Sequence, residues 1–260
     1  MPQIPREFGT LYYRARGEGP ECIVLLHDYF GTHQSWDVQA LQCSRYMLVL
    51  APDLRAHGRS VLNQGGMSIR EMAEDILAML DDADVDRAHL AGCSHGAVIA
   101  LHLARMSPER VASITVTSIP DLAEPDVIEY GKQFVSSVYP RLEAELAEIH
   151  GSRAEGYVRE ILLASFRQSL ESPPDDHLDA LAKADEIGVP TLVLGGDRDP
   201  VMPPTQALRL ARRINGAEFG VLPQTGHLAH RESPVLYTEH VRDFILRHKL
   251  QRSNEQGGSG

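Results

Sequence analysis

Short apolar runs alternate with longer helical segments along most of the chain, and this alternation limits the possible folds more than any other feature. The strand-like runs lie at 11–14, 22–26, 46–50, 87–91, 111–117, 191–194 and 219–222. Strands that alternate with helical segments are typical of a largely parallel sheet with helices on both faces. The sequence therefore predicts an α/β fold with a mostly parallel, doubly wound sheet.

Two helices of this pattern are well defined. Ser68 and Glu71 have the spacing of a capping box, and apolar residues follow at helical intervals as far as Leu80. These features predict a crossover helix that begins after Ser68. A second helical pattern, near Val235 to Leu250, predicts a last helix that closes the core.

The segment 122–187 interrupts the alternation. It contains several helical patterns separated by prolines and glycines, and no convincing strand. We interpret it as a helical insertion that forms a cap over a pocket, with a decorated crossover packed on the core as the alternative. The expected organisation is a core made of 1–121 and 188–250, a cap at 122–187 and a flexible tail at 251–260.

Composition narrows the function classes. The chain of 260 residues has a formal net charge of −11, which argues against nucleic acid or an anionic membrane as partner and favours a small molecule. The amino-terminal residues lack a basic-then-apolar signal pattern, and no apolar run is long enough to span a membrane, so we expect a cytoplasmic protein. The sequence does not indicate an oligomeric state.

Neither the cysteines nor any sequence motif predicts a metal site or a cofactor. Cys22, Cys43 and Cys93 are odd in number and lack the spacing of metal ligands, so buried or reduced thiols are expected. The sequence has no metal cluster, phosphate loop or dinucleotide fingerprint, and no cofactor is predicted.

Ser94 is the candidate nucleophile. It lies in Gly92-Cys93-Ser94-His95-Gly96, between an apolar run and a helical segment. In this G-x-S-x-G pattern the serine occupies a sharp, strained turn, and the glycines allow the chain to fold back without clashes. The sequence therefore predicts a nucleophile in a strained turn at the end of a strand, with an ordinary serine in a glycine-flanked turn as the alternative.

A serine hydroxyl needs a base and a group that orients that base. His227 follows Gly226 after one predicted strand, and Asp199 lies in Gly196-Asp197-Arg198-Asp199 after another. Sites of open α/β sheets form at the carboxyl ends of strands, where all three side chains are predicted to lie.

With these residues in this order, the chain resembles the α/β-hydrolase superfamily over almost its whole length. Four separated motifs carry the resemblance: 25–27 with Gly31-Thr32, 51–60, the turn at Ser94, and the pair formed by Asp199 and Gly226-His227. The resemblance implies Ser94 as nucleophile, Asp199 as acid and His227 as base, with backbone N–H groups of Tyr29 and His95 as the oxyanion hole.

Neighbouring residues offer alternatives within these motifs. Asp199 is preferred to Asp197 because the family pattern places the acid three residues after a glycine. His230 lacks a preceding glycine and is expected at the surface. His57 and Asp53 belong to a loop that in the family mostly braces the core, so a structural role is expected for both, and His27 is expected to hold its own loop.

The chain departs from the family pattern at Asp28, where a glycine usually follows the histidine. We expect its carboxylate to point outward and stabilise the loop, because a carboxylate that pointed inward would oppose a developing oxyanion. The His95 ring is expected to pack locally, with contact to substrate as the alternative. Possible substrate contacts are Asp28, Phe30, His95 and Phe134.

Hydrolysis of a small carboxylic ester or lactone through an acyl-enzyme is the preferred function, with carbon–carbon bond hydrolysis of a diketone-like substrate as a close variant. The Ser94-His95 pair also resembles cofactor-free dioxygenases of the same fold, which cleave quinolone-type rings. In those relatives the acid follows the next strand, where this chain has Ser118 and then Asp121. A ligand receptor without catalysis is a further alternative.

Overall fold

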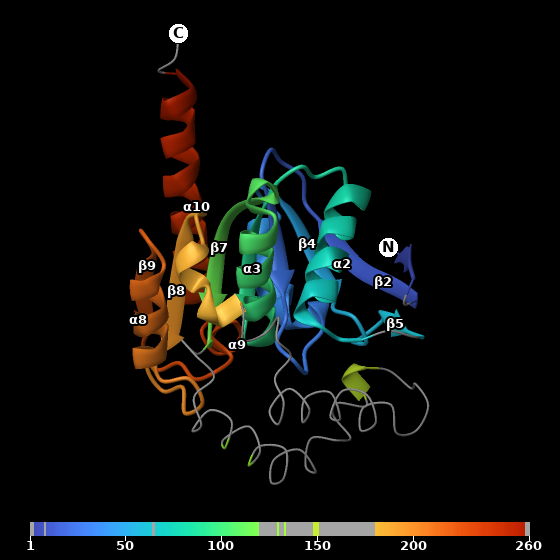
Figure 1. The fold of residues 1–260 in the computed structure, drawn as a ribbon, viewed down its shortest axis with the longest axis horizontal. Helices are drawn as coiled ribbons and strands as arrows, with labels where there is room; N and C mark the ends of the chain where they lie inside the picture. The colour runs from blue at the N-terminus through green and yellow to red at the C-terminus, as the bar shows by residue number, and fades with distance from the viewer. Residues whose placement is uncertain are drawn as a thin grey trace.

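The computed structural model describes residues 3–7, 9–63, 66–119, 129, 133, 148–150 and 180–257. A nine-stranded sheet in the order β1-β2-β4-β3-β6-β7-β8-β9, with β5 beside β2, forms the centre of the molecule (Figure 1). The strands are β1 (Gln3–Arg6), β2 (Gly9–Arg16), β3 (Cys22–Leu26), β4 (Leu48–Asp53), β5 (Val61–Leu62), β6 (Ala88–Cys93), β7 (Val111–Thr117), β8 (Thr191–Gly196) and β9 (Glu218–Leu222).

The sheet is mixed but mostly parallel, so the predicted fold class is confirmed. Strands β4, β3, β6, β7, β8 and β9 pair in parallel, whereas β2 pairs with β1, β4 and β5 in antiparallel fashion. Strands β3, β6, β7 and β8 are buried along their whole length, as expected for strands with helices on both faces. The short strands β1 and β5 were not predicted, because they lack an apolar run.

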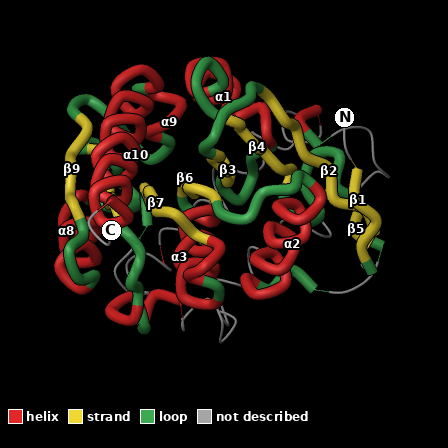
Figure 2. Tube along the Cα trace, turned by 90° about the horizontal axis from the view of Figure 1, so that it is seen from above, coloured by secondary structure: helices red, strands yellow, loops and turns green. Residues whose placement is uncertain are grey.

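Helices cover both faces of the sheet (Figure 2). Helices α2 (Ile69–Asp82), α3 (His95–Met106) and α8 (Pro204–Arg213) pack on one face, and α1 (Asp37–Cys43), α9 (Ala229–Glu232) and α10 (Pro234–Gly257) on the other. The predicted capping box of α2 is present. The Glu71 amide donates to Ser68 Oγ, and the Ser68 amide donates to Glu71 Oε2, each over 3.1 Å.

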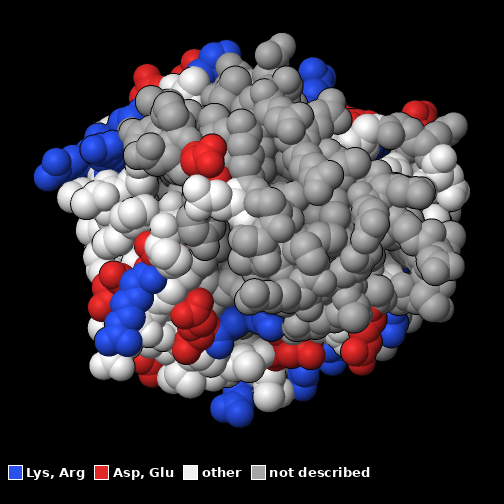
Figure 3. Space-filling model, turned by 90° about the horizontal axis from the view of Figure 1, so that it is seen from below, with Lys and Arg blue, Asp and Glu red and all other residues white. Residues whose placement is uncertain are grey.

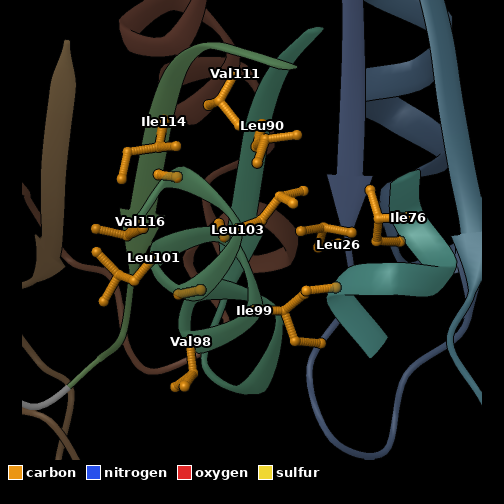
Figure 4. Packing of buried hydrophobic residues seen from close by; sticks show 14 of the residues in the cluster. Leu26, Ile76, Leu90, Val98, Ile99, Leu101, Leu103, Val111, Ile114 and Val116 are labelled. Atoms are coloured by element: carbon orange, nitrogen blue, oxygen red, sulfur yellow. The ribbon is translucent and has the colours of Figure 1, made fainter. Parts of the chain in front are cut away.

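Helix α3 is the centre of the larger core. Its side chains are buried on nearly every side from His95 to Ala104, and the helix packs against β6 and β7 of the sheet and against α2 beside it. Leu101 and Leu103 pack with Leu90 and Val116 of the sheet, while Ile99 points toward Ile76 of α2 (Figure 4). A helix buried all round is held in place by packing, so its first residue has a fixed position at the end of β6.

The opposite face contains a second core in which one prediction is wrong. His230 is only 1% exposed, whereas the sequence places it at the surface. Its ring stacks on Trp36, with centroids 4.0 Å apart and planes inclined by 26°. The short helix α9 turns His230 inward, toward Trp36 and Tyr237, and this direction depends on the tertiary fold rather than on adjacent charged residues.

The last helix is longer than the sequence predicts, whereas the cysteines have the predicted state. Helix α10 continues to Gly257, past the expected boundary at 250, since each added helical residue gains a backbone hydrogen bond. Cys22, Cys43 and Cys93 are free and buried, as expected. Among the described residues, no helix is both long and apolar enough to cross a bilayer.

Most of the predicted cap, 122–187, lies outside the described residues. The described parts are 129, 133, 148–150 and 180–187, the last of which contains a short 3-10 helix at Ala184–Glu186. On the face shown in Figure 3, acidic and basic side chains of the described surface are interspersed around the rim.

The burial of His230 predicts a specific pH dependence of stability. Burial, with smaller effects of Arg231 and His227, lowers the pKa of His230 from 6.5 to about 3. Neither ring nitrogen has a hydrogen-bond partner among the described residues. The unfolded chain binds this proton near pH 6.5 but the folded protein only near pH 3, so the stability falls as the pH falls through that range.

We expect His230→Phe, which keeps a ring on Trp36, to reduce this loss. Between pH 7 and pH 4 its free energy of unfolding is expected to fall by roughly 3 kcal/mol less than that of wild type, measured by urea unfolding. Phe244→Leu, in the same core, is the control and is expected to lower stability equally at both pH values. An unchanged pH dependence in His230→Phe would contradict the argument.

Candidate active site

Ser94 occupies a strained turn between β6 and α3. Its backbone angles are φ 53° and ψ −115°, and its amide donates to the Thr117 carbonyl over 2.9 Å. A Cβ added to Gly92 would lie 2.3 Å from the Gly96 carbonyl oxygen, and one added to Gly96 would lie 2.2 Å from that of Leu26. The predicted steric role of both glycines is therefore confirmed, and the strained backbone costs on the order of 1–3 kcal/mol.

Asp199 and His227 are brought together after β8 and β9. His227 Nδ1 lies 2.9 Å from Asp199 Oδ2. Asp199 Oδ1 accepts the amide protons of Val201 and Met202, each over 2.8 Å. The carboxylate side chain is fully buried, while the imidazole is 24% exposed. Because an ionised carboxylate only accepts, Nδ1 donates, which leaves Nε2 of a neutral ring able to take a proton.

The loop that carries His227 has supports on both sides. Glu232 accepts the amide protons of Gly226 over 2.7 Å and of Leu228 over 3.0 Å. Ser118 Oγ donates to the His227 carbonyl, and Cys93 Sγ lies 3.7 Å from the same oxygen. His227 is thus anchored beside the residue that precedes Ser94.

Sequence reasoning missed both Glu232 and Ser118. A carboxylate shortly after a glycine-containing turn is a weak signal for Glu232, because it can accept the amide protons that such a turn leaves free. Ser118 has no comparable signal, because its contact joins residues 109 positions apart in the sequence.

Asp197 has a different task from Asp199. It is exposed, and its Oδ1 accepts the Thr225 amide proton over 3.0 Å. Hydrogen bonds from the amides of Thr225 and Gln224 lower the pKa of this carboxyl group. Asp197 therefore stabilises the turn that precedes His227.

After β7, where the dioxygenase pattern expects the acid, the chain has Ser118, and Asp121 lies outside the described residues.

Asp28 is folded into its own loop. Its Oδ1 accepts the Phe30 amide proton over 3.2 Å, and its carbonyl accepts that of Gly31 over 3.1 Å. The predicted loop-stabilising role is therefore confirmed. The predicted outward direction is wrong, since the residue is only 9% exposed and Oδ2 is buried with no hydrogen-bond partner among the described residues.

Two histidines brace this loop, His27 as predicted and His57 in the structural role expected of it. His27 Nδ1 donates to the Asp28 carbonyl over 2.7 Å, and His27 Nε2 accepts the Leu54 amide proton over 2.9 Å. His57 Nε2 contacts the Tyr29 carbonyl. Burial lowers the pKa of both rings, so both favour the neutral form.

Asp53 has the expected bracing role too. It accepts hydrogen bonds from the amide and ring of His33, over 2.8 and 2.7 Å, and from the Arg59 amide over 2.8 Å.

The other predicted site residues have distinct environments. The His95 ring packs locally, as expected, with Nε2 3.2 Å from Met72 Sδ and its centroid 4.7 Å from that of Tyr29. Phe30 is partly exposed beside Tyr29. Phe134 lies outside the described residues.

A second serine-histidine-carboxylate chain lies at the opposite edge of the sheet. His89 Nδ1 lies 2.8 Å from Ser113 Oγ, and His89 Nε2 lies 3.2 Å from Glu21 Oε2. Ser113 is 1% exposed in the middle of β7 and has regular strand geometry, so no substrate reaches its hydroxyl. These contacts connect strands and do not form a site.

The described residues contain no group of three or more His, Cys, Asp or Glu side chains that could hold a metal ion. The arrangement at Ser94, Asp199 and His227 offers a hydroxyl, a buried carboxylate and an imidazole at one edge of the sheet. Such groups can perform proton transfer and nucleophilic attack.

Known proteins share this architecture. The chain is 26% identical to 3-oxoadipate enol-lactonase 1 of Acinetobacter baylyi, over 92% of this chain and 94% of the relative. It is 27% identical to the 2-hydroxy-6-oxononadienedioate/2-hydroxy-6-oxononatrienedioate hydrolase of Cupriavidus pinatubonensis, over 88% of each. The structure of Est816, an N-acyl homoserine lactone degrading enzyme, matches with a TM-score of 0.71 and 30% identity, over 94% of this chain and 100% of that chain.

A family model described as the alpha/beta hydrolase family matches residues 23–239. This range includes the strained serine turn, the buried aspartate and the histidine loop, together with most of the sheet that positions them. The chain therefore belongs to the alpha/beta hydrolase family.

Proposed function

We propose that this protein is a serine hydrolase of small-molecule carboxylic esters or lactones. The observation that carries the proposal is the 2.9 Å contact of His227 Nδ1 with the buried Asp199, at the sheet edge where Ser94 is held in a strained turn. This contact fixes the tautomer in which Nε2 accepts the serine proton. Ser94 is the nucleophile, His227 the base and Asp199 the orienting carboxylate.

The reaction proceeds in two halves. Ser94 Oγ attacks the carbonyl carbon while His227 Nε2 takes its proton, and the same proton then passes to the leaving alkoxide as the acyl-enzyme forms. In the second half, water attacks the acyl group, His227 takes a proton from it, and that proton returns to Ser94 as the acid is released. The backbone N–H groups of Tyr29 and His95 donate to the oxyanion in both halves.

Two lines of support favour hydrolysis, the first from related proteins and the second from the contact of His227. Two of the related proteins described above are named for lactones, and the third is named a hydrolase of an oxo-dienedioate, which corresponds to the carbon–carbon bond variant. The contact of His227 Nδ1 with Asp199, the acid position of the hydrolase pattern, supports hydrolysis over cofactor-free oxygenation. The cap at 122–187 remains a proposal and would cover the acyl group.

The first test is a substrate panel of esters, lactones, diketones and a quinolone-type heteroaromatic, run with wild type and Ser94→Ala. We expect wild type to hydrolyse at least one ester or lactone, and Ser94→Ala to lower kcat by about 10⁴-fold or more, because the nucleophile is lost. An oxygen electrode follows each reaction. Full activity of Ser94→Ala, or oxygen uptake with the heteroaromatic, would contradict the proposal.

The second test separates the two aspartates after β8. Asp199→Asn keeps an acceptor for the Val201 and Met202 amides but presents an amide N–H to His227 Nδ1, which favours the wrong tautomer. We expect kcat for the best ester of the panel to fall by about 10²–10⁴-fold. Asp197→Asn, two residues away on the exposed turn, is the matched control and is expected to stay within about threefold of wild type. Equal losses in both variants would argue against Asp199 as the orienting acid.

A further inference from the structure

Three consecutive backbone carbonyls of the loop beside Ser94 each contact a buried histidine. The Asp28 carbonyl contacts His27 Nδ1 over 2.7 Å, the Tyr29 carbonyl contacts His57 Nε2, and the Phe30 carbonyl contacts His150 Nε2 over 3.2 Å. The first two histidines belong to the core. His150 belongs to the segment 148–150, within the predicted insertion, and this third contact was not expected from the sequence.

The His150 ring is held at both nitrogens. The Gly58 amide lies 3.1 Å from Nδ1, and the Phe30 carbonyl lies 3.2 Å from Nε2. An amide N–H only donates and a carbonyl only accepts, so Nδ1 is the acceptor and Nε2 carries the proton. The residue is 1% exposed, and its ring packs edge-on against that of His57, with centroids 5.5 Å apart.

This neutral tautomer connects two loops through one side chain. Gly58 belongs to the loop that follows β4, and Phe30 belongs to the turn closed by the hydrogen bond from the Gly31 amide to the Asp28 carbonyl. Hydrogen bonds to the carbonyls at both ends of such a turn restrict the rotation of its peptide planes. The Tyr29 N–H shares its peptide plane with the Asp28 carbonyl at the start of this turn, and the Phe30 carbonyl anchors the end of the turn, so the direction of this N–H depends on both contacts.

We propose that His150 is a positioning residue, which holds the Phe30 carbonyl so that the Tyr29 N–H stays aimed at the oxyanion of the reaction. This inference rests on the proposed function. It implies that the segment 148–150, within the predicted insertion, contributes to transition-state stabilisation. The interaction is realised in the transition state, so its loss lowers kcat with little change in KM.

Two variants at this position isolate the hydrogen bond to Phe30. His150→Gln can place an N–H donor where Nε2 lies, whereas His150→Asn retains an acceptor near the Nδ1 position and loses that donor. His89→Asn is the matched control, since His89 is also buried and bonded at both nitrogens but lies at the opposite edge of the sheet.

The measurements are kcat and KM with 4-nitrophenyl butyrate, the rate at which a fluorophosphonate labels Ser94, and thermal denaturation. We expect His150→Asn to lower kcat and the labelling rate by about tenfold, a fraction of the 10²–10³-fold cost of losing an oxyanion donor, with KM within about twofold of wild type. His150→Gln is expected to recover most of the loss. His89→Asn is expected to lower the melting temperature without lowering kcat.

Several outcomes would overturn the inference. A kcat of His150→Asn within about twofold of wild type would do so, as would equal losses in both His150 variants and in His89→Asn. Ring ¹⁵N chemical shifts of His150 in the wild-type protein give a readout independent of activity and of variant folding. A proton on Nδ1 at pH 7 would also refute the argument. If wild type is not labelled by the fluorophosphonate, the proposed function fails, while the ring shifts still test the loop contact.

Discussion

The close approach of Gly96 to the end of β3 is the constraint on which the candidate site depends. A Cβ at this position would lie 2.2 Å from the Leu26 carbonyl oxygen and 2.7 Å from that of His27, so no residue but glycine fits without a shift of the backbone. The contact brings the first turn of α3 against the start of the loop 27–32. It therefore sets both the direction of Ser94 and the distance of Ser94 from that loop.

The core provides the force that holds this strained arrangement. Ser94 has a positive φ that a serine adopts only at a cost, and the cost is offset because α3 is buried on nearly all sides against the sheet and its neighbour α2. The buried parallel strands β3, β6, β7 and β8 bring the residues that follow them to one edge. The strained turn is thus stabilised by the packing of a whole helix and several strands, and not by contacts of the turn alone.

Polar contacts, most of them buried, then define the direction of each side chain at this edge. Asp199 is held by two amides before it meets His227, and the backbone on either side of His227 is fixed by Glu232. The loop 27–32 is held by histidines, among them His150 from outside the core. The supports of Asp199 and of the loop 27–32 lie in a water-poor environment, where a satisfied network is rigid and a broken one is costly.

The sequence by itself determined the alternating strands and helices, the capping box of α2, the sharp turn at Ser94 and the order of serine, aspartate and histidine. These features depend on periodicity and on local sterics, and both are determined by residues that are close together in the sequence. Tertiary structure alone decided that Asp28 is buried, that His230 stacks on Trp36 and that His150 contacts Phe30. The last contact joins residues 120 positions apart, and no local pattern encodes such a distance, because it results from how separate elements pack together.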